Sequence, residues 1–145
     1  MSVAVATLLT LTALSAEPAT RYGVAADLKA YPQATPQECL SSVLKAADDD
    51  RFDYLLAHLA DPAFVDERVR VLHGGKFEAQ VEDTRTRFDP PTRKLLARFL
   101  KDGHFSIEND HAEVRLDDVK DRAVFFKKVD GRWRLEHRNK PDEAK

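Results

Sequence analysis

Hydrophobic and polar residues alternate in the last part of the chain, which predicts β-strands. Asp130-Gly131 divides two such runs, and Asp-Gly is a favoured two-residue hairpin turn because both turn positions need positive φ. A turn at this point pairs Phe126 with Leu135 and places Trp133 on the same face. One face of the hairpin is then apolar and the other polar, as in an antiparallel sheet that is packed on one side only.

A second hairpin is predicted just before the first. From His104 the apolar residues also recur at every second position, and Asn109-Asp110 forms a plausible tight turn between the two runs. Together the two hairpins predict a curved four-stranded antiparallel meander. Its predicted apolar face consists of Phe105, Ile107, Ala112, Val114, Leu116, Val124, Phe126, Trp133 and Leu135.

The first half of the domain has helical periodicity. Thr35-Pro36 followed by Glu38 is a capping box with proline at the first helical position. Residues 36–47, 51–59, a short stretch after Asp61-Pro62, 77–88 and 92–102 are the expected helices, whereas residues 69–72 fit either a helix end or a short strand. The helices must cover the apolar face of the sheet, which predicts an α+β fold with N-terminal helices on one face of the meander.

The beginning of the chain reads as an export signal. Residues 1–16 are uncharged and apolar and end in small residues, although no Lys or Arg precedes the apolar run. The alternatives are a first helix of the domain or a membrane anchor, for which the run is short of about 20 residues. The expected organisation is a signal peptide (1–16), a linker (17–34), the domain (35–140) and a polar tail (141–145), in a periplasmic or secreted protein.

The charge distribution bears on possible partners. A net charge of −2 argues against nucleic-acid binding by electrostatics. Lys127 and Arg134 are predicted to lie on the outer face of the sheet, as a basic edge beside an acidic helical layer or as a basic face that meets an anionic partner. No metal-binding or cofactor motif is present, so no metal and no cofactor are expected. Cys39, the single cysteine, is predicted to be a core residue.

His137 is the main candidate for chemistry. It is predicted to follow Leu135 on the apolar face, where a histidine can titrate near neutrality, or else to be an ordinary histidine at a strand end. Glu108 and His111, which pair beside the first turn, are either solvated turn residues or an acid–base or metal site. The predicted ligand-pocket residues are Phe105, Phe126, Trp133, Leu135 and His137.

Two parts of the chain carry a family resemblance: residues 35–59, a capped helix that ends at an acidic break, and residues 124–135, a strand that leads to the Asp-Gly-Arg-Trp turn. In this order, with strands between them, they resemble the NTF2-like (SnoaL-like, cystatin-like α+β) superfamily over residues 35–138. The resemblance implies helices on a curved sheet, a cone-shaped pocket, and a function as enzyme, ligand binder or adaptor. No position matches a catalytic motif of that superfamily.

These observations favour an exported, non-catalytic binding or accessory domain. A small apolar molecule or a protein is the expected partner, and a homodimer through the sheet is open. One alternative is a small lyase, isomerase or hydrolase that uses His137 with a nearby carboxylate. Another is a protein-interaction domain that uses the basic face of Lys127 and Arg134. A cavity of a few hundred Å³ beside His137 would favour a ligand site over a filled interior.

Overall fold

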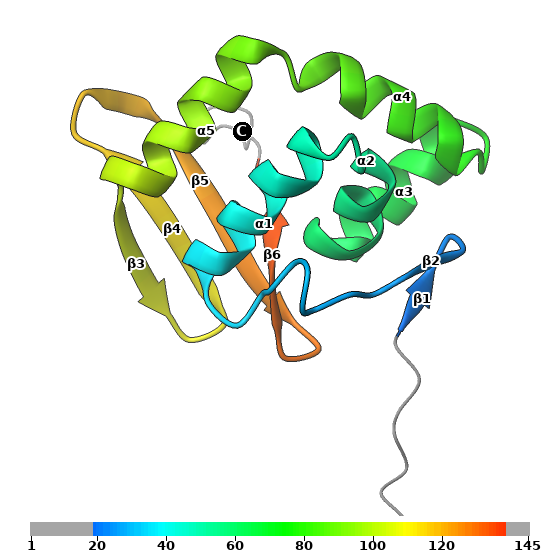
Figure 1. The fold of residues 1–145 in the computed structure, drawn as a ribbon, viewed down its shortest axis with the longest axis horizontal. Coiled ribbons are helices and arrows are strands. Elements are labelled where there is room, and N and C mark those ends of the chain that lie inside the picture. The colour runs from blue at the N-terminus through cyan, green and yellow to red at the C-terminus, as the bar shows by residue number, and fades with distance from the viewer. Residues whose placement is uncertain (1–18, 139–145) are drawn as a thin grey trace, which may run out of the picture.

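The computed structural model describes residues 19–138. It contains a small hairpin, a group of helices and then a four-stranded meander, with the helices on one face of the sheet (Figure 1). The predicted α+β class is therefore confirmed. The helices are α1 (Pro36–Asp48), α2 (Phe52–Tyr54), the π-helical turn η1 (Leu55–Leu59), α3 (Pro62–Leu72), α4 (Phe77–Arg87) and α5 (Pro90–Asp102). The strands are β1 (Thr20–Arg21), β2 (Val24–Ala25), β3 (His104–Glu108), β4 (His111–Leu116), β5 (Val119–Val129) and β6 (Arg132–Glu136).

The predicted signal segment (1–16) and polar tail (141–145) lie outside the described residues. Between residues 19 and 138, the helices are all too short or too polar to cross a bilayer.

The predicted helix starts are present. Thr35 Oγ1 accepts a hydrogen bond from the Glu38 amide at 3.1 Å, and the Glu38 carboxylate accepts one from the Ala34 amide at 2.7 Å. Asp61 and Asp89 cap α3 and α5 in the same manner, each with proline at the start of the helix. These caps satisfy backbone N–H groups that have no partner in the first turn. Residues 69–72 form the last turn of α3 and not a strand.

The second predicted helix ends in a π turn. α2 passes directly into η1, where the Ala60 amide donates to the Leu55 carbonyl at 3.0 Å. All five residues of η1 are buried, so this turn lies inside the molecule. Its C-terminal carbonyl groups must find partners within the protein, which bears on the site described below.

The meander has the strand order β3-β4-β5-β6 and both predicted hairpin registers. Phe126 is opposite Leu135, and the turn residues Asp130 and Gly131 have φ of 52° and 76°. These values are those of the twisted hairpin turn that Asp-Gly favours. The register between β4 and β5 shifts between Val114 and Leu116, and the additional residues of this irregularity lie on β5.

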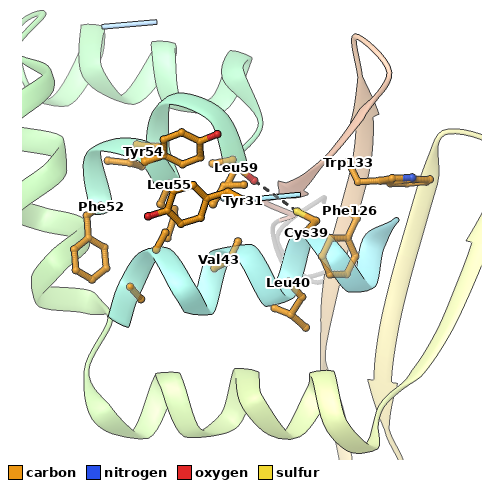
Figure 2. Packing of buried hydrophobic residues seen from close by; sticks show 14 of the residues in the cluster. Tyr31, Cys39, Leu40, Val43, Phe52, Tyr54, Leu55, Leu59, Phe126 and Trp133 are labelled. Atoms are coloured by element: carbon orange, nitrogen blue, oxygen red, sulfur yellow. Dashed lines mark hydrogen bonds between the residues drawn. The ribbon is translucent and has the colours of Figure 1, made fainter. Parts of the chain in front are cut away.

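The core lies where α1 crosses the sheet (Figure 2). Leu40, Val43 and Phe126 are 0 % exposed and Trp133 is 5 % exposed. Ile107 is on the predicted face, opposite Ala112, but it is 56 % exposed and does not belong to the core. It lies on β3 at the edge of the sheet, whereas α5 packs against the neighbouring strand β4.

The N-terminal segment, which was predicted as a linker, packs on the helices. Tyr31 is buried in the core, and Tyr22 stacks on Phe77 with ring centroids 4.2 Å apart. Arg21 and Asp66 form an ion pair at 2.6 Å. Residues 20–34 are thus held to the domain by both apolar and charged contacts.

Candidate functional site

A cavity of about 470 Å³ lies between the helices and the two C-terminal strands. Its walls come from η1, α3, α4 and α5 on one side and from β5 and β6 on the other. This volume is within the range of about 300–1,000 Å³ that is typical of small-molecule sites. The apolar lining residues are Leu55, Leu56, Ala60, Phe64, Phe88, Leu96, Ala123, Val124, Phe125 and Leu135.

The sheet provides one apolar wall and the helices the other. Val124 and Leu135 point to the helical side like the core residue Phe126, but they are only half-buried because they border the cavity. Leu96 on α5 and Phe88 just before it face them in the same half-buried state. A molecule in this space would therefore remove apolar surface from water.

Two polar side chains replace apolar ones on the inner face of α4. Gln80 and Thr84 are 4 % and 9 % exposed and both line the cavity. The Gln80 amide nitrogen donates to Thr84 Oγ1 at 3.3 Å, and Thr84 Oγ1 donates to the Gln80 carbonyl at 2.9 Å. Gln80 Oε1 is buried and has no hydrogen-bond partner among the described residues. The amide group thus retains a free acceptor in the wall of the cavity.

Charged side chains surround the mouth on the helical side. Asp83 lies between two arginines, with its Oδ2 3.0 Å from Arg87 Nε and 3.8 Å from Arg68 Nη2. Asp83 thus forms an ion pair with each arginine, and the pair with Arg87 is the closer one. The Arg68 guanidinium lies over the ring of Phe64, 5.4 Å from its centroid.

The end of β6 forms the opposite side of the mouth. Arg138 Nε donates to Glu136 Oε2 at 3.2 Å, and the Arg138 guanidinium lies over the Phe125 ring at 4.4 Å. His111 Nδ1 is 3.4 Å from the same Glu136 oxygen. His137 is exposed and stacks on Phe64, with centroids 4.5 Å apart. Both carboxylates that line the cavity, Glu136 here and Asp83 on α4, are therefore engaged by arginine.

The structure divides the predicted pocket residues into two groups. Leu135 and His137 line the cavity. Phe126 and Trp133 are buried in the core beside α1, and Phe105 packs on the same core, so none of the three borders the cavity. His137 also follows β6 rather than continuing its apolar face, since the strand ends at Glu136.

The predicted basic face is not an outer surface. Arg134 is 2 % exposed, and its Nη1 donates to the His58 carbonyl at 3.3 Å, which also accepts from Gln33 Nε2 at 2.9 Å. Lys127 is opposite Arg134 as predicted, but its Nζ lies 3.5 Å from the Asp61 carboxylate. The prediction of an exposed strip formed by these two residues was wrong.

The physical reason is the buried end of η1. The last carbonyl groups of a helix lack intrahelical partners and carry partial negative charge, which favours cations there. Arg21 Nε donates to the Ala57 carbonyl at 2.9 Å, and Arg134 Nη1 donates to the carbonyl of the next residue, His58. Cys39 Sγ lies 4.0 Å from the Leu59 carbonyl (Figure 2). Burial raises the pKa of the Cys39 thiol to about 12, although Arg134 opposes the shift, so Cys39 is a neutral core residue as predicted.

The other candidate at the first hairpin is a shallow polar hollow. Ser106, Glu108, His111 and Glu113 border a space of about 220 Å³ on the sheet. Across residues 19–138, no group of His, Cys, Asp and Glu side chains is arranged to hold a metal ion. Glu108 and His111 are both exposed beside the turn, which is the arrangement of solvated turn residues.

The sequence prediction missed most of the residues on the helical side of the cavity. A helix was predicted over residues 77–88, but none of its residues was considered as a site residue. Gln80 could have indicated the site, because a polar side chain on the inner face of a helix is costly unless it meets other polar groups. The chain matches no protein-family model, no curated protein and no solved structure.

Proposed function

We propose that this protein is an exported, non-catalytic binding domain that holds a small, largely apolar molecule between its helices and its sheet. The single observation that carries this proposal is the cavity of about 470 Å³ with apolar walls from β5, β6 and the helices. Apolar walls with a few polar groups at defined positions are typical of ligand sites. The arrangement of helices on a meander is also consistent with the NTF2-like superfamily, to which we propose the chain belongs.

A neutral fluorophore tests the binding function. The dye N-phenyl-naphthylamine becomes fluorescent in apolar surroundings, so a saturable increase with the full chain is the expected result. Leu96→Trp places a large ring in the cavity and should abolish the increase, since Leu96 is a half-buried lining residue. Leu72→Trp is the matched control, because Leu72 is 57 % exposed and lies away from the cavity.

The two variants separate a cavity site from surface adsorption. Dye binding that survives Leu96→Trp, or that is lost equally in Leu72→Trp, would contradict the proposal. Melting temperatures of both variants show whether the fold is kept. Export is tested separately by N-terminal sequencing of the mature protein, and a chain that still begins at Met1 would contradict cleavage after the signal segment.

Catalysis by His137 is the second candidate, because His137 and Glu136 both line the cavity. The geometry favours it less, since Glu136 accepts a hydrogen bond from Arg138 and faces His111. A general base needs its carboxylate or imidazole within hydrogen-bond reach of the proton it removes. Turnover of a nitrophenyl ester that is lost in His137→Gln but retained in His104→Gln would support this candidate; equal rates in both would exclude His137 as its catalyst.

A further inference from the structure

Arg68 differs from the other arginines at the mouth of the cavity. It lines the cavity, and its side chain is 25 % exposed. Its nearest carboxylate oxygen, Asp83 Oδ2, is 3.8 Å away and lies closer to Arg87 Nε, at 3.0 Å. Within residues 19–138, the Arg68 guanidinium donates no hydrogen bond at ordinary distance. The N–H groups of this half-buried guanidinium therefore remain available to a molecule in the cavity.

An aromatic ring holds this guanidinium in place. The Arg68 guanidinium lies over the ring of Phe64, which lines the cavity. The ring of His137 stacks on Phe64 as well. Stacking of this kind occupies the face of the guanidinium and leaves its N–H edge free. That edge matches the two oxygens of a carboxylate, which arginine binds in a bidentate manner.

The charge of the lining is also uneven. Arg68, Arg87 and Arg138 contribute three positive charges, and Asp83 and Glu136 contribute two negative ones. Asp83 forms its closer ion pair with Arg87, and Glu136 accepts a hydrogen bond from Arg138. Arg68 thus shares Asp83 with Arg87 at the longer of the two distances, and an anion from outside would give it a closer partner.

We infer that the ligand is an amphipathic carboxylate, whose hydrocarbon part lies between the apolar walls and whose carboxylate is bound by Arg68. This inference rests on the proposed binding function and adds the chemical class of the ligand.

Calorimetric titration with decanoate and decanol tests the inference on the full chain at neutral pH. The two probes share a hydrocarbon chain and differ in the charged group. Decanoate is expected to bind roughly tenfold or more tightly than decanol, since charge-assisted hydrogen bonds are among the stronger polar contacts. Arg68→Gln should remove this difference by weakening the binding of decanoate.

Arg70→Gln is the matched control, because Arg70 lies on the same helix, is exposed and does not line the cavity. It should keep the preference for decanoate, and Arg68→Lys should keep only part of it, since lysine has charge without a bidentate edge. Melting temperatures verify that each variant is folded.

The outcomes separate the two proposals. Equal affinity of the wild type for both probes, or an equal loss in Arg68→Gln and Arg70→Gln, overturns the carboxylate inference but leaves the binding function. Binding of the neutral fluorophore without any binding of decanoate has the same meaning. If neither probe nor the fluorophore binds, the proposed function fails as well.

Discussion

Trp133 and Leu135 lie on the same strand, β6, in very different surroundings. Trp133 is 5 % exposed and packs with Phe126 and α1 in the filled part of the core. Leu135 is half-buried and borders the cavity. One apolar sheet face is thus packed at one end and hollow at the other, which shows that strand alternation alone does not tell a core from a binding site.

The helices explain the difference. α1 presents small and aliphatic residues to the sheet, with Cys39, Leu40 and Val43 fully buried, so it can approach closely. At the other end, α3 and α4 bring Arg68 and Asp83 to the cavity. Charged groups are costly to bury without water, so these helices cannot close onto the sheet. The hollow follows from polar residues on the helices and not from the strands.

Truncation at the two ends of β6 should have unequal effects. Trp133→Ala is expected to cost about 3–5 kcal/mol in the free energy of unfolding, because it leaves a void in a packed core. Leu135→Ala should cost only about 1 kcal/mol, because part of its side chain already faces open space. Urea unfolding measures both free energies, and equal losses would show that the two positions are packed alike.

Adding a methyl group is the reverse experiment. A Cβ at Gly103 would overlap the Phe99 carbonyl oxygen and Val114 Cγ2. Gly103→Ala should therefore destabilise by about 1–3 kcal/mol through overpacking. Val124→Ile extends into the cavity and should be neutral or slightly stabilising in the same unfolding measurement. A larger loss for Val124→Ile would show that the hollow end is less open than its geometry indicates.

His58 provides a pH test of the filled region. Burial lowers its pKa, and the nearby charges of Arg132, Arg134 and Arg21 act in the same direction, against the hydrogen bond to the Val24 carbonyl. The unfolded state, with a histidine pKa of about 6.5, then binds the proton more strongly than the folded state. Stability should be fully present above about pH 6.5 and fall at lower pH, by at most about 1.4 kcal/mol per pH unit.

Unfolding of wild type and His58→Gln over a pH series measures this contribution. The variant should lose part of the pH dependence, whereas His104→Gln, at an exposed site, should retain it. Parallel curves for wild type and His58→Gln would mean that His58 does not contribute.

The smallest effect is expected at the charged mouth. The Arg87 side chain is 68 % exposed in its ion pair with Asp83. Exposed pairs contribute about 0–1 kcal/mol, so Arg87→Gln should change the melting temperature little. A large loss of stability would show that the mouth, like the core, is under structural constraint.

Local chemistry made much of the fold predictable. Thr35, Asp61 and Asp89 begin helices where their side chains meet the next amides, and these interactions need no distant partner. Asp130-Gly131 sets the hairpin register because the turn geometry is decided within the turn. Both kinds of signal act over a few residues, so the sequence alone carries them.

The candidate site was predictable only in part, because its residues come together from distant segments. Leu135 and His137 could be proposed from the hairpin, but Arg68, Gln80 and Asp83 reach the cavity through the packing of α3 and α4. In the sequence, these three residues look like ordinary polar residues on the solvent-exposed side of a helix. Nothing within a few residues indicates that the sheet lies opposite them.

The chain by itself determined the α+β class, the helix starts and the strand register, since these depend on caps, turns and periodicity. Tertiary structure alone decided that Arg134 is buried, because the carbonyl groups it meets belong to the end of η1, far away in the sequence. It also decided that one end of the sheet is packed and the other hollow. The physical reason is the same in both cases: burial depends on what lies opposite a residue, and that is fixed by long-range packing.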